Sequence, residues 1–183
     1  MKKFTYKYDK LSQLFHWMTA GLVLAAFVLG PGDFGQVTST VGQLSTRQDI
    51  IWHESIGITV FMLTLLRLIW VAIRPGAPQN AMSASMRTLA KLTHTVLWVL
   101  LLALPLCGLL TLASESQPLT LLGGLKIDLS LWMSGSSLLK MTDWGEVHKF
   151  LGDSIIWLAG FHALAAIYHH VKLKDKVLIS MLR

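Results

Sequence analysis

Long stretches without an acidic or basic residue constrain the fold of this chain more than any other feature of its sequence. Three of them contain no Asp, Glu, Lys or Arg and cover residues 11–32, 92–114 and 154–171. A fourth apolar stretch, residues 50–73, is interrupted only by His53, Glu54 and Arg67. Because about 20 helical residues cross the hydrocarbon core of a bilayer, the four stretches predict four transmembrane helices.

The composition also favours a membrane protein. Hydrophobic residues make up 53% of the 183-residue chain and charged residues only 14%, whereas a soluble domain carries about 25% charged residues. The net charge of +6 does not indicate nucleic-acid binding, since the lysines and arginines lie between apolar stretches. The single cysteine, Cys107, excludes a disulfide framework and the CxxCH motif that attaches haem covalently.

We therefore expect an all-α, integral membrane four-helix bundle in which residues 1–183 form one domain. The expected transmembrane helices are, in round limits, 11–30, 50–73, 89–112 and 147–171, with a long outer loop at 113–146. The first helix should remain in the mature protein, since it contains His16 and lacks a small-x-small cleavage site.

One part of the outer loop shows a period of two. Leu125, Ile127, Leu129 and Leu131 alternate with polar residues and are followed by Trp132. This alternation predicts a short extended segment that lies at the membrane interface.

The distribution of charge predicts the orientation of the bundle. With four helices, both termini share a side with the loop between the second and third helices. That side holds twelve of the basic residues: Lys2, Lys3, Lys7, Lys10, Arg67, Arg74, Arg87, Lys91, Lys172, Lys174, Lys176 and Arg183. The opposite side holds four basic residues, and eight of the ten acidic ones. The positive-inside rule therefore places both the N- and the C-terminus in the cytoplasm.

Histidines inside a bilayer are costly, so each one is a candidate for function. The chain has seven of them: His16, His53, His94, His148, His162, His169 and His170. In the expected topology His16 and His162 lie at matching depth near the inner surface, and His53 and His148 match near the outer surface. Depth alone therefore predicts two pairs, each drawn from two different helices.

Helical spacing supports the same two pairs. His148 and His162 are 14 residues apart, which is nearly four turns, so both face the same side of their helix. Arg67 lies 14 residues after His53 and shares its face in the same way. The residue four positions after each paired histidine is small: Ala20, Gly57, Gly152 and Ala166. The corresponding residues after the other three histidines are the larger Trp98, Leu173 and Lys174.

Such pairs favour a haem iron over other metal centres. Zinc or copper needs three or four converging ligands, whereas two imidazoles from facing helices suit the two axial positions of a haem. A small residue one turn away leaves room for a flat macrocycle. Two alternatives stay open: each histidine could simply hydrogen-bond within the bundle, and Arg67 could extend to the cytoplasmic surface rather than pair with haem propionates.

The ordered histidines and their neighbours resemble the bacterial cytochrome b561 family. These are four-helix, di-haem proteins of the bacterial inner membrane and include a superoxide:ubiquinone oxidoreductase. The similarity covers about residues 8–182. The matching motifs are Phe15-His16-Trp17, His53 to Gly57, Leu66-Arg67-Leu68, His94 with Leu104-Pro105, His148, Gly160-Phe161-His162 and His169-His170 before Lys174-Asp175-Lys176.

The resemblance implies two non-covalent b haems, each with two axial histidines. His16 and His162 would hold the inner iron, and His53 and His148 the outer one. The quinone-site histidine of the family corresponds to His169, and we expect ubiquinone near His169, Arg67, His94 and Lys91. Two alternatives remain: His169-His170 could be a polar helix end, and His94 could be hydrogen-bonded within its own helix.

Several functions are compatible with these expectations. The first is an oxidoreductase that takes electrons from superoxide outside and passes them to ubiquinone. The second is a haem-containing membrane anchor and electron conduit for a periplasmic redox protein or a dehydrogenase, which fits the acidic outer side. A pore or proton carrier lined by histidines fits less well, because it would not require the small residues one turn away.

Overall fold

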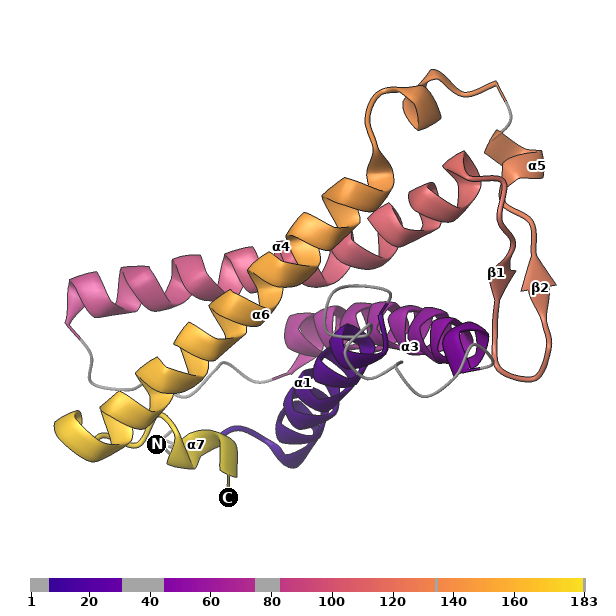
Figure 1. The fold of residues 1–183 in the computed structure, drawn as a ribbon. Helices are drawn as coiled ribbons and strands as arrows, with labels where there is room; N and C mark the ends of the chain where they lie inside the picture. Colours follow the sequence, from indigo (N-terminus) through magenta and orange to yellow (C-terminus); the bar gives the residue numbers. More distant parts are fainter. Residues whose placement is uncertain (1–6, 31–44, 75–82, 134, 183) are drawn as a thin grey trace.

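The computed structural model describes residues 7–30, 45–74, 83–133 and 135–182. Four long helices dominate it: α1 (Lys10–Leu29), α3 (Ser45–Ile73), α4 (Ala84–Ser114) and α6 (Trp144–Tyr168) (Figure 1). Each contains a stretch that is long and apolar enough to cross a membrane. The predicted fold class, an all-α membrane bundle with four spanning helices, is confirmed.

Three of the helices begin three or more residues before the limits expected from hydropathy. α3 begins at Ser45, α4 at Ala84 and α6 at Trp144. Polar caps explain two of these starts: Ser83 accepts a hydrogen bond from the Met86 amide at 3.4 Å, and Asp143 accepts one from the Glu146 amide at 3.0 Å. Hydropathy identifies only the apolar part of a helix that can lie in lipid. A capped polar turn extends the helix beyond this apolar part.

The helices pack mainly as two pairs, α1 against α3 and α4 against α6, and α3 also contacts α4. α4 and α6 cross each other in Figure 1, with α1 and α3 beside them. The buried centre consists of Val60, Leu100, Leu101 and Ile155. On α6 this centre lies between His148 and His162, and on α3 it lies between His53 and Arg67, so it separates the two ends of the bundle.

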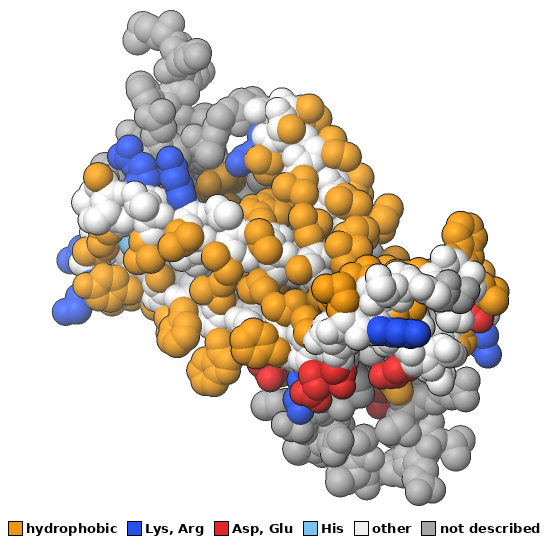
Figure 2. All heavy atoms as spheres, turned by 90° about the horizontal axis from the view of Figure 1, so that it is seen from above, with side chains coloured by type: hydrophobic (Ala, Val, Ile, Leu, Met, Phe, Trp, Pro, Cys, Tyr) orange, Lys and Arg blue, Asp and Glu red, His pale blue; other side chains and the backbone are white. Residues whose placement is uncertain are grey.

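The surface around the helices of the bundle is hydrophobic. Ile69 on α3 is 59% exposed and Leu89 on α4 is 65% exposed, as expected for side chains that face lipid. Figure 2 shows hydrophobic side chains over the middle of the molecule, most lysines and arginines toward one end, and acidic side chains toward the other.

The two described ends of the chain lie side by side. The amide of Tyr8 donates to the carbonyl of Ser180 at 3.1 Å, and the indole of Trp17 donates to the carbonyl of Met181 at 2.9 Å. Ser180 and Met181 belong to the short helix α7 (Ile179–Leu182), which follows a π-helical turn, η2 (His169–Leu173), at the end of α6. A shared end is what an even number of spans requires. Lys2, Lys3, Asp33 and Arg183, which entered the charge count, lie outside the described residues.

A polar cluster joins the same end of α1 to α3. Asp9 caps α1 by accepting from the Ser12 amide at 2.8 Å, and the indole of Trp70 donates to its carboxylate at 3.1 Å. Arg74 lies 3.8 Å from the same carboxylate. Burial raises the pKa of Asp9, but the hydrogen bonds from Ser12 and Trp70 outweigh burial and hold this pKa below its ordinary value.

The loop between α4 and α6, expected on the outer side, folds back onto the start of α3. Strands β1 (Leu119–Thr120) and β2 (Lys126–Ile127) form a small antiparallel hairpin. The Thr120 amide donates to the Glu54 carboxylate at 2.5 Å, and the Leu122 amide donates to the Ser55 hydroxyl at 2.9 Å. These bonds hold the hairpin over the end of the bundle that contains His53.

The extended segment expected from the alternation is shorter in the structure. It is restricted to β2, after which α5 (Ser130–Met133) forms a helical turn, followed by the 3-10 turn η1 (Ser137–Lys140). Asp128 accounts for the change, because its carboxylate accepts from the Ser130 amide at 2.9 Å in the manner of a helix cap. The expectation of strand through Leu131 was therefore wrong.

Candidate functional site

The structure brings four histidines together as two pairs, one toward each end of the bundle. His16 of α1 and His162 of α6 have ring centroids 6.4 Å apart, with an angle of 71° between the ring planes. His53 of α3 and His148 of α6 have centroids 5.9 Å apart, with an angle of 81°. These are the two combinations expected from depth in the sequence.

Both separations fit two imidazoles on opposite sides of one haem iron. An iron lies about 2 Å from an imidazole nitrogen, as other first-row metals do, so two opposed rings have centroids about 6 Å apart. In the part of the chain that the structure describes, no three His, Cys, Asp or Glu side chains gather as ligands for one metal ion. The two histidine pairs therefore suit a metal centre that takes two ligands from the protein.

The rings of the outer pair are held by neighbouring helices. The Nδ1 atom of His53 lies 2.7 Å from the carbonyl oxygen of Ala26 in α1, and Nδ1 of His148 lies 2.9 Å from that of Leu104 in α4. Because a carbonyl oxygen only accepts, each Nδ1 carries the hydrogen and donates it. Nε2 is then the nitrogen that could bind a metal, and contacts of this kind at Nδ1 orient the histidine ligands of metal sites.

Two glycines make room for the same rings. A Cβ atom at Gly30, just after α1, would lie 3.1 Å from Nδ1 of His53, and one at Gly108 of α4 would lie 3.2 Å from Cε1 of His148. The sequence analysis gave no role in holding the rings to either glycine, or to Ala26 and Leu104. A glycine inside an apolar helix or at its end was the available signal, but it does not identify the ring that it faces.

The space beside the outer pair is open. At Gly57 and Gly152, one turn after His53 and His148, a Cβ atom would meet nothing within 4 Å. A flat macrocycle that lies along the helices needs such space next to its ligands. The residues at this end therefore fit a haem in both ligand spacing and room.

His94 lies beside the inner pair without matching the geometry of an axial ligand to the same iron. Its ring centroid is 5.1 Å from that of His162, shorter than the separation of about 6 Å expected across an iron. Its Nδ1 lies 2.6 Å from the carbonyl oxygen of Ala90, one turn earlier in α4. The structure thus contains the hydrogen bond within α4 that the sequence analysis kept as an alternative.

Arg67 belongs to the same end of the bundle. Its guanidinium lies over the ring of Trp98 at 4.9 Å from the ring centroid, a cation–π contact. It is close enough to His16 and His162 to interact with them electrostatically. A fixed positive charge therefore lies near the inner histidine pair.

The remaining candidates are His169 and Lys91. His169 begins the π-helical turn η2 and contacts Asp175, a residue to which the sequence analysis gave no role. Lys91 is exposed on α4, one turn before His94. No contact between Lys91 and His169 is present among the described residues.

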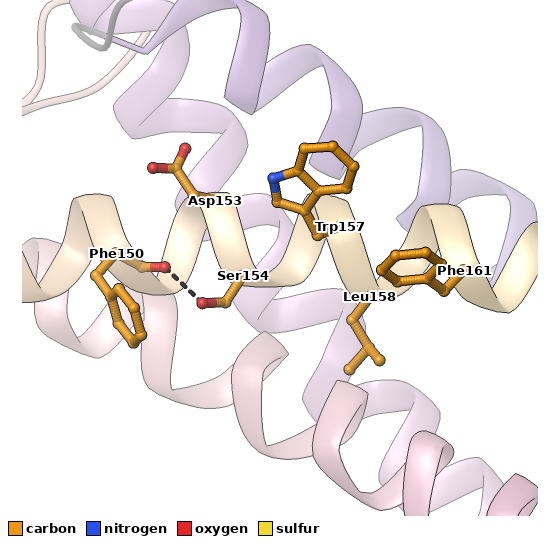
Figure 3. A pocket seen from close by; sticks show the side chains of 6 residues that line it. All are labelled: Phe150, Asp153, Ser154, Trp157, Leu158 and Phe161. Atoms are coloured by element: carbon orange, nitrogen blue, oxygen red, sulfur yellow. Dashed lines mark hydrogen bonds between the residues drawn. The ribbon is translucent and has the colours of Figure 1, made fainter.

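A groove on the outer face of α6 is not part of this site. It has a volume of about 540 Å³ and is lined by Phe150, Asp153, Ser154, Trp157, Leu158 and Phe161 (Figure 3). Trp157 lies nine residues after His148, or two and a half turns, and therefore faces away from the histidine pairs. The groove is open toward the surroundings of the bundle.

Comparison with known proteins agrees with this geometry. Residues 7–183 match the family model of prokaryotic cytochrome b561. The chain is 29% identical to cytochrome b561 homolog 2 of Escherichia coli, over 96% of this chain and 91% of that protein. It is 27% identical to a cytochrome b562 of Cereibacter sphaeroides, over 96% and 95%. It is also 26% identical to the probable superoxide oxidase CybB of Yersinia pestis, over 96% of each chain.

The family match covers nearly the whole described bundle, and cytochromes of this family bind haem b and transfer electrons within the membrane. The resemblance inferred from the histidine motifs is confirmed. The chain belongs to the prokaryotic cytochrome b561 family, and is a haem-binding redox protein of a bacterial membrane.

Proposed function

We propose that the chain carries electrons between an outer donor and ubiquinone through two b haems. His16 and His162 would bind the inner iron, and His53 and His148 the outer one. The observation that supports this most is the separation of the ring centroids, 6.4 Å and 5.9 Å. Both values match two imidazoles across one iron.

The ligand set favours electron transfer over chemistry at the metal. A b haem supplies reversible one-electron storage at its iron. Two histidines would hold each haem, which would leave no protein-accessible position at the iron for dioxygen or an organic substrate. Ala26 and Leu104 hold the outer rings through their carbonyl groups. This keeps the ligands fixed while the charge on the centre changes.

We place the quinone at the inner end, near His169, Arg67, His94 and Lys91. A quinone has two carbonyl oxygens that accept hydrogen bonds, and these side chains are all donors in at least one protonation state. Arg67 and His94 are the members that lie closest to the inner pair. His169, the first residue of η2, lies seven residues or about two turns beyond His162 and continues the face of α6 that carries His162.

Two donors are considered for the outer end. The similarity to a probable superoxide oxidase supports superoxide, and Lys140 and Lys149 lie near the start of α6. Eight of the ten acidic residues belong to the same side, however, and they repel an anion. This acidity favours the alternative, an electron conduit that docks a basic periplasmic redox protein or a dehydrogenase.

The proposal includes the bacterial inner membrane as location, with both termini in the cytoplasm and one membrane domain. The hydrogen bond from the Tyr8 amide to the Ser180 carbonyl supports a common side for the two ends. The excess of lysine and arginine on that side supports its assignment as cytoplasmic.

Stopped-flow mixing of superoxide with the oxidised protein distinguishes the two donors. An oxidase shows fast haem reduction that superoxide dismutase abolishes, followed by quinol formation when ubiquinone is present. A conduit shows no reduction above the dismutase control, but is reduced by a basic redox protein in a reaction that salt slows.

A further inference from the structure

The end of α6 contains a histidine–carboxylate contact that the histidine pairs do not involve. After Tyr168 the chain forms the π-helical turn η2 and then Lys174, whose φ of 51° is left-handed. This reversal brings Asp175 back over the helix end, where its Oδ2 lies 2.5 Å from Nδ1 of His169. A regular α-helix would direct the two side chains to different faces, since they are six residues apart.

Both oxygens of the Asp175 carboxylate are engaged. Oδ2 contacts His169, and Oδ1 accepts from the Val177 amide at 3.1 Å. The amide of Asp175 donates to the carbonyl of His169 at 3.3 Å, which closes the turn. The side chains of His169 and Asp175 are only 16% and 23% exposed. The pair is therefore a fixed, partly buried unit.

This contact determines which nitrogen of His169 faces a ligand. An ionised carboxylate only accepts hydrogen bonds, so Nδ1 carries a hydrogen and donates it to Asp175. Nε2 is then the nitrogen that gains and loses a proton. His169 lies seven residues after His162, about 10 Å further along the same helix face.

We propose that His169 and Asp175 form the proton-exchanging pair of the quinone site, an inference that rests on the proposed function. His169 Nε2 exchanges the proton with a quinone oxygen. Asp175 is a positioning residue, which keeps the hydrogen on Nδ1 and stabilises the imidazolium that forms.

The step balances in either direction of electron flow. Oxidation of a quinol releases two electrons and two protons. In each one-electron step an O–H bond of the quinol breaks, an N–H bond forms at Nε2, and one electron leaves separately to the electron carrier of the proposed function. The pair passes the proton on to water at the same end of the bundle. In the reverse direction Nε2 protonates the oxygen of a reduced quinone. No electron passes through the pair.

The Asp175→Asn variant tests the proposal in the haem-loaded protein. Asn can still accept from the Val177 amide, but its NH2 group donates to Nδ1 and favours the wrong tautomer of His169. With a short-chain ubiquinol under anaerobic conditions, we expect the maximal rate of haem reduction to fall about tenfold to hundredfold, as for other partners that orient a histidine. The KM for quinol should change by less than about twofold, and the haem spectrum should stay unchanged.

Asp153→Asn is the matched control, because Asp153 is an exposed carboxylate on the opposite face of α6. It should keep the rate of the unmodified protein. If Asp175→Asn keeps that rate as well, Asp175 has only a structural role and the proposal is overturned. If the unmodified protein itself shows no haem reduction by quinol, the proposed quinone function is contradicted. The proposed role of His169 and Asp175 is then contradicted as well.

A second variant covers the case in which Asp175→Asn does not fold. In His169→Ala, imidazole added to the buffer should restore at least part of the lost rate, because it replaces the proton-exchanging group. A slow variant with an intact haem spectrum that imidazole does not rescue would overturn the proposal.

Discussion

The imidazole of His148 lies directly against Gly108 of the neighbouring helix α4. A Cβ atom at Gly108 would be 3.2 Å from Cε1 and 3.3 Å from Nδ1 of the ring. The carbonyl of Leu104, one turn earlier in α4, holds the same ring at 2.9 Å. α4 contributes no proposed haem ligand itself, but it determines where the imidazole of His148 lies.

Gly108→Ala should therefore weaken the outer haem site. The added methyl group must displace the ring or α4, and overpacking of this kind costs about 1–3 kcal/mol. We expect purified Gly108→Ala protein to lose much of its outer haem and to keep the inner one, measured as haem per polypeptide. Gly160→Ala is the control, since a Cβ there meets nothing within 4 Å. Equal haem content in the two variants would contradict this account of Gly108.

Glu54→Gln should loosen the outer hairpin. The Glu54 carboxylate accepts from the Thr120 amide at 2.5 Å, and a hydrogen bond to a charged group contributes about 1.5–3 kcal/mol. We expect severalfold faster proteolysis between β1 and β2, and faster hydrogen exchange at Thr120. Glu146→Gln, a similar change in the first turn of α6, should leave both rates unaltered. Unchanged exchange at Thr120 in Glu54→Gln would show that Ser55 alone holds the hairpin.

Acid should weaken the contact between the start of α1 and the end of α3. The folded-state pKa of Asp9 lies below its ordinary value of 3.8, so Asp9 stabilises the fold above that value and loses its contribution as pH falls through the lower folded value. We expect Asp9→Asn, which keeps the helix cap, to be less stable than the unmodified protein at pH 7 by less than about 1 kcal/mol. The difference in unfolding free energy should shrink as the pH falls below 3.8 and vanish once the pH is well below the folded-state pKa of Asp9. A difference that is independent of pH would exclude the charge of Asp9 as its cause.

Cysteine labelling can test the orientation. Lys126→Cys lies in β2 of the outer hairpin, and Lys172→Cys lies in η2 at the opposite end. With both termini in the cytoplasm, an impermeant maleimide should label Lys126→Cys in intact spheroplasts and Lys172→Cys only after lysis. The native Cys107 is buried and serves as the background. The reverse pattern would invert the assignment.

The parts of the structure that follow from local sequence were predictable, and those that depend on packing were not. Charge-free stretches indicate spanning helices directly, and a spacing of 14 residues fixes the common face of His148 and His162. The contacts of Gly30 and Gly108 depend on how closely helices approach, which hydropathy does not encode. Asp175 was missed because it reaches His169 only through a π-helical turn and the left-handed Lys174.

The number of b haems per polypeptide, measured by the pyridine haemochrome assay on purified protein, tests the central claim most directly. We predict two haems in the unmodified protein, one in His16→Ala, one in His53→Ala, and two in His94→Ala. One haem or none in the unmodified protein, or loss of a haem in His94→Ala but not in His16→Ala, would contradict the proposed ligand pairs.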